Sequence, residues 1–274
     1  MRLLLVALLV ASAGCAQTPP SDPSAPADAA ETPEVPPQIG PVMAGPLVAD
    51  SIRTAATLVG AMHARYRGRW YRTLSFTQAT TRVIGGDGRQ RETWREWAAL
   101  PGRLRIEMDD PLQGVDVLFV GDTTYIYRDG ALAAVRADRN PLLTWGFDVY
   151  TQPPAATLAV LADEGMDLSA FRLDAWDGRQ MYVLGVPESG EVWVEKERLL
   201  FVRLVEPGEG GAMQDVRFLD YEPLGDAWIA PLVEVWTGGE RVFWEEYSDI
   251  EADVALDPVL FDPRRWAEGV AAHD

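Results

Sequence analysis

The chain has 274 residues, of which 47% are hydrophobic, and a formal net charge of −18 at pH 7. This length and hydrophobic fraction are typical of a globular protein with one large domain or two small ones. The dispersed acidic residues exclude a surface suited to nucleic-acid phosphates or to anionic lipid headgroups. The sequence holds 1 cysteine, which excludes an intrachain disulfide and a metal site built from several thiolates.

The N-terminus has the order of a secretory signal. Arg2 precedes the apolar run Leu3–Val10, small residues follow, and Cys15 ends the segment. The run is too short to cross a bilayer as a helix. We interpret residues 1–15 as a lipoprotein signal whose Cys15 thiol receives diacylglycerol, with Ser12 standing where the usual lipobox has leucine. An ordinary signal peptide with an incidental cysteine is the alternative.

Residues 16–46 are rich in proline, alanine and acidic residues and poor in large apolar side chains. Such a stretch buries too little surface to offset the entropy of ordering, so we expect a disordered tether. Its prolines hold it extended, so about thirty residues reach at most about 90 Å from a membrane. By the sorting rule of bacterial lipoproteins, Ala16 in place of aspartate after the cysteine favours the outer membrane.

Residues 47–274 are expected to form a single domain that begins with a helix over Ser51–Arg67. One face of this helix is apolar at helical spacing: Ile52, Ala55, Ala56, Val59, Met62 and Tyr66. Asp50 or Ser51 is placed to cap the helix, and Gly68 is placed to end it. From Trp70 onward the hydrophobic period changes to two, and pairs such as Asp129-Gly130 mark turns. Short strands with short turns are typical of an antiparallel meander.

An apolar helical interlude interrupts the strands, over residues 140–150 and 155–163. Pro153 and Pro154 open its second helix. Strands resume at Phe171, and the piece from Leu256 to Trp266 is expected to cap the fold. The segment Ala227–Trp236 is predicted as one strand.

The predicted fold class is α+β, mostly antiparallel β, with a curled incomplete β-barrel. A sheet of about ten strands tends to curl, so its concave face needs cover from the N-terminal helix and the interlude. Such a sheet either fills with side chains or encloses a cavity. The candidate cavity residues are Leu74, Phe76, Leu104, Ile106, Val117 and Phe119 on strands, and Leu142, Leu143, Leu158 and Leu161 in the covering helices.

The order of these elements resembles the LolA/LolB lipoprotein-sorting superfamily over most of residues 49–262. The segments that carry the resemblance are Tyr71–Gln78, Leu100–Glu107, Gly121–Tyr127 and Trp193–Leu199. The resemblance implies a LolA-like incomplete barrel whose hydrophobic interior holds acyl chains under a helical lid. Members include the soluble lipoprotein carrier, its outer-membrane receptor, lipid carriers and an envelope-stress sensor. The carrier has a lid-locking arginine, for which Arg72 and Arg105 are candidates here, with a surface or cross-strand role as the alternative.

The sequence carries no recognised catalytic or metal-binding pattern. Its 2 histidines, His63 and His273, have no metal-ligand spacing, and no Gly-x-Ser-x-Gly nucleophile elbow occurs. Three acidic pairs could supply a general acid and base, although such pairs are usually solvated: Asp109-Asp110, Asp163-Glu164 and Glu245-Glu246. We therefore predict no catalytic residues, cofactor or metal.

The favoured function is a lipid-anchored periplasmic protein that binds lipid or lipoprotein acyl chains and touches the membrane through Cys15. Nucleic acid is not expected as a partner. An envelope-stress sensor or scaffold that binds a protein partner is the alternative. A carboxylate-dependent hydrolase is the least favoured one.

Overall fold

The computed structural model describes residues 51–86, 88–108 and 114–271. Residues 1–50, including the signal, Cys15 and the whole of the expected linker, lie outside the described residues, as do Asp109-Asp110 and His273. Among the helices of the described residues, none is both long and apolar enough to span a membrane.

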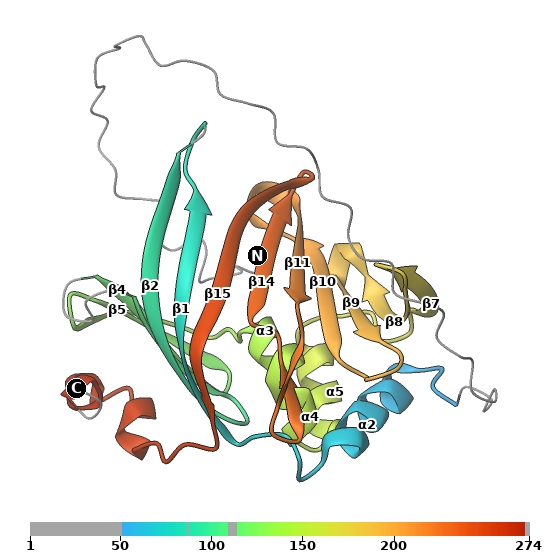
Figure 1. Ribbon diagram of the computed structural model, residues 1–274, viewed down its shortest axis with the longest axis horizontal. Coiled ribbons are helices and arrows are strands. Elements are labelled where there is room, and N and C mark those ends of the chain that lie inside the picture. The colour runs from blue at the N-terminus through green and yellow to red at the C-terminus, as the bar shows by residue number, and fades with distance from the viewer. Residues whose placement is uncertain (1–50, 87, 109–113, 272–274) are drawn as a thin grey trace.

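The fold is built on a 13-stranded antiparallel sheet with the order β6-β5-β4-β3-β2-β1-β15-β14-β11-β10-β9-β8-β7 (Figure 1). The first meander comprises β1 (Thr73–Val83), β2 (Arg89–Ala99), β3 (Arg103–Met108), β4 (Val115–Val120), β5 (Thr123–Arg128) and β6 (Ala131–Arg136). The second comprises β7 (Phe171–Trp176), β8 (Arg179–Val186), β9 (Gly190–Glu195), β10 (Phe201–Pro207), β11 (Met213–Leu219), β14 (Leu232–Thr237) and β15 (Glu240–Ala252). The sheet is not closed, because β6 and β7 are its two edges.

The two meanders join through the first and last strands. β1 pairs with β15 in an antiparallel ladder that places Leu74 opposite Ala252 and Arg82 opposite Phe243. The ladder has a register shift between Ser75 and Thr77, and such irregularities increase local twist. The expected curled antiparallel sheet is confirmed, although it contains more strands than predicted.

The predicted strand Ala227–Trp236 is wrong in its extent. The structure divides it into β13 (Ala227–Ile229) and β14, and β13 pairs only with β12 (Glu222–Leu224) in a separate two-stranded sheet. Pro231 lies between β13 and β14. Because proline has no backbone N–H to donate, it interrupts a ladder at this point.

The N-terminal helix is α2 (Ala55–Tyr66), shorter than predicted at its start. Its N-cap is Thr54 rather than Asp50 or Ser51: the Thr54 side chain accepts from the Thr57 backbone N–H, and the Thr57 side chain accepts from the Thr54 N–H. The buried face contains Leu58 in addition to most of the predicted residues, whereas Ala56 is exposed.

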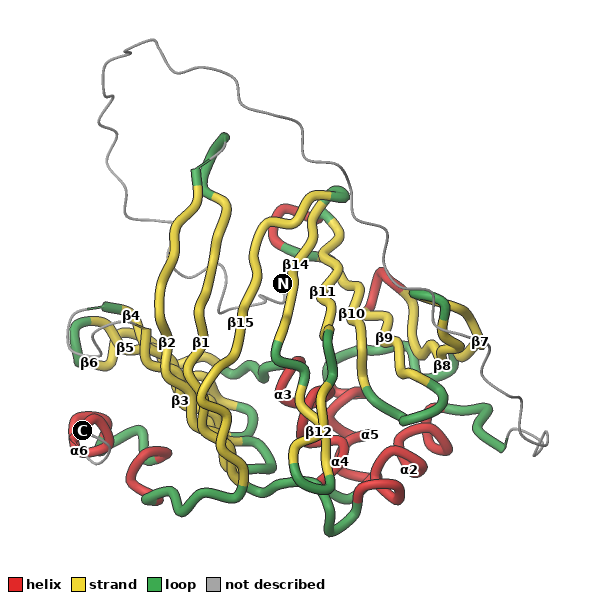
Figure 2. Tube along the Cα trace, in the orientation of Figure 1, coloured by secondary structure: helices red, strands yellow, loops and turns green. Residues whose placement is uncertain are grey.

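The helical interlude connects edge strand β6 to edge strand β7 along the chain. It consists of α3 (Pro141–Leu143), the π-helical turn η1 (Thr144–Asp148), α4 (Val149–Thr151) and α5 (Pro154–Asp163), and residues 141–163 are called the lid below. Figure 2 shows α4 and α5 beside α2 and far from the C-terminal helix α6 (Trp266–Ala271). The lid therefore covers the inner face of the sheet together with α2.

The C-terminal segment covers the outer face of the first meander, as predicted for a capping piece. It contains η4 (Pro258–Phe261) and α6, which contribute Leu260, Phe261 and Trp266 to a second apolar cluster with Trp97 and Leu118 of the sheet. Both faces of the sheet are thus buried here.

Candidate functional site

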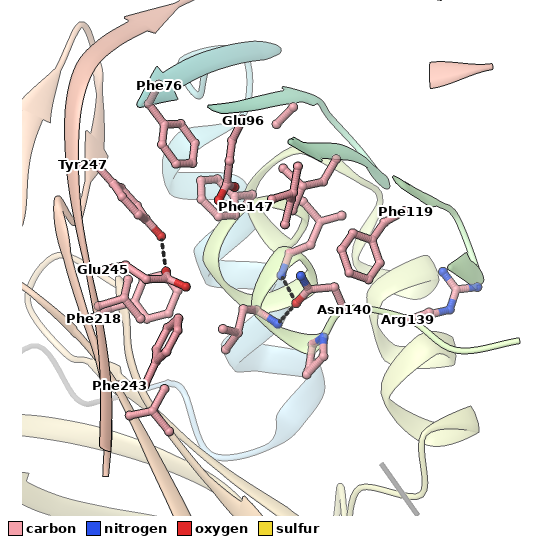
Figure 3. A pocket seen from close by; sticks show the side chains of 18 of the residues that line it. Phe76, Glu96, Phe119, Arg139, Asn140, Phe147, Phe218, Phe243, Glu245 and Tyr247 are labelled. Carbon is pink, nitrogen blue, oxygen red and sulfur yellow. Dashed lines mark hydrogen bonds between the residues drawn. The ribbon is translucent and has the colours of Figure 1, made fainter. Parts of the chain in front are cut away.

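The inner face of the sheet and the lid enclose a small cavity of about 60 Å³ (Figure 3). It is lined mainly by apolar side chains from both parts, among them Phe76, Ile106, Phe147, Phe218 and Phe243. This volume holds only a few water molecules, so lid side chains fill most of the space under the sheet. A chain of many methylenes requires the lid to move.

The ten predicted cavity residues are divided between this cavity and the surrounding core. Six of them line the cavity: Phe76, Leu104, Ile106, Phe119, Leu142 and Leu143. Leu74, Val117 and Leu161 are fully buried in the main core instead, and Leu158 packs against that core. Strand alternation placed Leu74 and Val117 on the inner face, and that part of the face is covered completely in the fold.

Two carboxylic acids also line the cavity, Glu96 of β2 and Glu245 of β15. Glu96 is 5% exposed. The Tyr247 hydroxyl donates to Glu245 Oε2 over 2.9 Å, and both side chains point into the cavity in Figure 3. The strands that carry the two acids flank β1 on either side.

Burial changes the acidity of these groups. Burial raises the pKa of Glu245 to about 7, opposed by hydrogen bonds from Tyr247 and Gln78. Burial, with the charge of Glu245 in addition, raises the pKa of Glu96 well above its usual range. Two such acids titrate as a coupled pair that retains protons near neutral pH.

Glu96 was missed as a site residue by sequence reasoning. The available signal was its position between Trp94 and Ala98 on the inner face of the strand, where an acid is out of place. The predicted acidic pair Glu245-Glu246 does not converge, because neighbouring residues of a strand point to opposite faces and Glu246 is exposed.

Among the described residues, two hydrogen bonds fasten the lid to the sheet. Asp148 of η1 accepts a hydrogen bond from the Gly102 backbone N–H over 2.9 Å, and burial raises its pKa to about 7. The Tyr150 hydroxyl accepts from the Phe201 N–H over 2.9 Å. The Tyr150 ring also stacks on Trp70 with centroids 3.8 Å apart.

The structure corrects both candidates for a lid-locking arginine. Within the described residues, neither Arg72 nor Arg105 makes a hydrogen bond or ion pair with the lid. Arg72 is exposed, and its backbone N–H donates to Asp253. Arg105 is buried on the outer face and bonds to Glu107 and the C-terminal segment. The arginine at the cavity is Arg139, just before α3.

A more open pocket of about 440 Å³ adjoins the cavity and shares Asp138, Arg139 and Pro141 with it. The predicted pair Asp163-Glu164 lines this second pocket, not the cavity. In the part of the chain that the structure describes, no group of three or more His, Cys, Asp or Glu side chains is arranged to hold a metal ion.

Solved structures with this fold include three with TM-scores slightly above 0.5. A protein domain assigned to outer membrane lipoprotein sorting, from Vibrio parahaemolyticus, is 13% identical with a TM-score of 0.52 and covers 76% of this chain and 96% of its own. A LolA superfamily protein from Nitrosomonas europaea is 10% identical with a TM-score of 0.51 and covers 74% of this chain and 97% of its own. A DUF1329 family protein from Desulfovibrio piger is 16% identical with a TM-score of 0.51 and covers 76% of this chain and 95% of its own.

These likenesses establish the fold as LolA-like and confirm the fold class predicted from the sequence. No family model matches the sequence, and no curated protein does. At these identities the likeness defines the architecture alone.

Proposed function

We propose that this protein is a lipid-anchored binding protein of the bacterial envelope that holds an acyl chain between its sheet and its lid. The observation that carries the proposal is the apolar cavity, which lies between the inner face of the sheet and a separately fastened lid. The LolA-like fold agrees with such a role in lipid or lipoprotein trafficking.

The energetics favour binding once the lid has moved. Each buried methylene contributes about 0.8 kcal/mol, so burial of a twelve-carbon chain contributes roughly 10 kcal/mol before the cost of moving the lid is subtracted. The lid has few polar fasteners, Asp148 and Tyr150 among them, and each net hydrogen bond contributes only about 1 kcal/mol. Opening also uncovers apolar lid side chains such as Leu143 and Trp145, so a long acyl chain must bury a comparable apolar area in their place.

The anchor and the location belong to the same proposal. Cys15 would carry the lipid, residues 16–46 would act as the tether, and the body would face the periplasm from the outer membrane. A Cys15→Ser chain should lose incorporation of radiolabelled palmitate in cells and leave the membrane fraction. Retained labelling of that variant would contradict the anchor.

Isothermal titration calorimetry with dodecanol tests the binding function. We use the full-length Cys15→Ser chain without detergent and keep dodecanol below its solubility limit. Saturable binding of one dodecanol per chain is expected. The absence of any saturable binding heat, with dodecanol and with the charged dodecyl compounds described below, would contradict the function.

A protein partner is the second candidate. The exposed apolar side chains Leu132 and Val135 on edge strand β6 and Leu173 on edge strand β7 support it, because unpaired edges can take up a partner strand. A Leu132→Glu/Val135→Glu variant should lose a partner that is captured without lipid, and it should keep dodecanol binding.

A carboxylate-dependent hydrolase has one supporting observation, since Glu96 and Glu245 lie in one cavity. The mostly apolar lining and small volume fit a hydrocarbon better than a polar substrate with its attacking water. Hydrolysis of p-nitrophenyl dodecanoate is expected to be equal in the native chain and in Glu96→Gln/Glu245→Gln. A loss of hydrolysis in the variant would favour the enzyme.

A further inference from the structure

Glu96 differs from the other buried acids of this sheet. On the outer face, Glu191 binds Arg172 and Trp193, each over 2.8 Å. Glu195 likewise binds Arg179 over 2.9 Å. Among the described residues, by contrast, no hydrogen bond or ion pair reaches the Glu96 carboxyl, although it lines the cavity and is 5% exposed.

Glu245 also lacks a cationic partner within the described part of the chain. It accepts hydrogen bonds from the Tyr247 hydroxyl and from the Gln78 amide, which are both neutral. Beside it, the Gln78 amide donates to Thr80 over 2.8 Å, and the Gln78 Oε1 atom is buried without a partner among the described residues. This end of the cavity thus holds the unpartnered Gln78 oxygen and two acids that no cation pairs, while the Arg82 Nε and Nη2 atoms are buried donors without a partner among the described residues.

The arginines nearby do not form ion pairs with Glu96 or Glu245 within the described residues. Arg139 lines the cavity mouth together with Asp138, and the adjoining pocket adds further acids, including Asp163 and Glu206. Arg82 lies along β1 with its guanidinium 5.9 Å from the centroid of the Phe243 ring, and it makes no ion pair with Glu245 or Glu96. The entrance therefore carries an excess of negative charge, and the interior holds two acids without a paired cation.

We propose that the molecule held in this cavity is an amphiphile with a protonated amine head, which donates its N–H groups to Glu96 and Glu245. The inference rests on the proposed function, because it names the head group of the molecule whose tail the cavity shelters. A cationic amine supplies the donors and the charge that a buried carboxyl pair otherwise lacks. A carboxylate or phosphate head brings no cation to this pair and would meet the acidic side chains at the entrance.

The closed cavity has space for a head group, and the tail extends where the lid opens. Its volume of about 60 Å³ suits a few heavy atoms. The apolar side chains Leu142 and Phe147 of the lid lie across the same cavity and would contact the first methylenes.

Proton release is the signature of this binding. Burial raises the pKa of both glutamates, so below neutral pH they are protonated before the ligand arrives. An ammonium head stabilises the carboxylate form, so binding expels a proton. Affinity then rises by up to about tenfold per pH unit from pH 5 to pH 7. Tyr247, Asp138, Arg139 and the more distant Arg82 are the other titratable or charged groups facing this end of the cavity.

The experiment compares dodecylammonium, dodecanol and dodecanoate by calorimetry on the Cys15→Ser chain, each below its micelle-forming concentration. We expect dodecylammonium to bind at one per chain and at least tenfold more tightly than dodecanol. Titrations at pH 6 in two buffers of different ionisation heat should show release of about one proton. Glu96→Gln/Glu245→Gln should abolish both the preference and the proton release.

The net charge of −18 calls for a control for unspecific attraction. Glu246→Gln/Glu251→Gln removes two exposed charges from the same strand, and it should leave the preference unchanged. If Glu96→Gln/Glu245→Gln does not fold, proton release on binding of dodecylammonium to the Cys15→Ser chain still tests the inference. Equal or tighter binding of dodecanol or dodecanoate, or binding of the amine without proton release, would overturn the inference and leave acyl binding intact. If none of the three binds, the proposed function fails instead.

Discussion

The guanidinium carbon of Arg105 lies 3.5 Å from the centroid of the Trp266 ring. In the same site, Arg105 Nε donates to Glu107 over 2.6 Å, and its terminal nitrogens donate to the Leu260 and Trp266 carbonyls. A fully buried arginine of the sheet thus fixes the C-terminal segment to the outer face, away from the lid.

Arg105→Ala should destabilise the fold strongly. The substitution removes a buried ion pair and the cation that stacks on Trp266, and breaking a buried pair costs about 3–5 kcal/mol. Urea unfolding followed by circular dichroism measures the loss. Arg91→Ala, on the exposed side of β2, should change the free energy of unfolding by less than about 0.5 kcal/mol. Equal effects of the two substitutions would contradict this role of Arg105.

Stability should fall as pH rises through the neutral range. Asp148, Glu245 and Glu96 have raised pKa values in the fold, so the folded chain binds their protons more tightly than the unfolded chain does. Stability from these groups is complete below about pH 4 and is lost as pH rises toward and beyond pH 7, by up to about 1.4 kcal/mol per pH unit and group. Chemical unfolding at pH 5, 6, 7 and 8 measures the slope.

Asp148→Asn should reduce that slope and raise stability at pH 8, because the amide oxygen can still accept from Gly102 without a buried charge. Asp226→Asn, at an exposed position, should leave the slope unchanged. A slope that is the same in the native chain and in Asp148→Asn would contradict the burial of an ionisable acid under the lid.

Lid opening should depend on the Asp148–Gly102 hydrogen bond. Asp148→Ala removes the acceptor, so the lid should open more often and the association rate of dodecanol should rise by roughly 2- to 10-fold. Stopped-flow fluorescence, with Trp145 of the lid as a reporter, measures this rate. Asp148→Asn keeps the acceptor and should bind at nearly the native rate. A faster rate in both variants, or in neither, would contradict the fastener.

Filling the cavity should block binding without unfolding the chain. Ala98 lines the cavity, and Ala98→Leu adds three carbons that occupy much of its 60 Å³. Dodecanol affinity should fall by at least about tenfold, since the methylenes lose their burial site. Ala175→Leu, on exposed strand β7, should bind dodecanol as the native chain does. Unchanged binding by a folded Ala98→Leu chain would place the ligand elsewhere.

The local elements could be predicted because periodicity and turn residues act over short distances. The alternation around Leu104 and Ile106 identified the inner face of β3, and the apolar interlude identified the lid. The ladder between Leu74 and Ala252 could not be predicted in the same way, because strand patterns do not specify which distant edges meet.

The polar part of the site depended on tertiary contacts that the sequence does not display. Glu96 is an ordinary acid in the sequence, and only the curvature of the sheet and the lid above it enclose its side chain with Glu245. Arg105 was a candidate lid residue for a related reason. The sequence indicates its position on a strand, but it does not show that Trp266 covers the outer face there. The need for glycine at position 146 of the lid is also a tertiary effect, because an added Cβ would lie 3.1 Å from the Phe218 ring.

The lipid content of the purified protein shows whether the cavity holds an acyl chain in cells. The Cys15→Ser chain, exported in cells and purified without detergent, would be extracted with organic solvent and the extract measured by mass spectrometry beside the same chain with Ala98→Leu. We predict close to one acyl-bearing molecule per chain, and much less in Ala98→Leu. Equal traces of lipid in both chains, with no uptake after incubation with phospholipid vesicles, would contradict it.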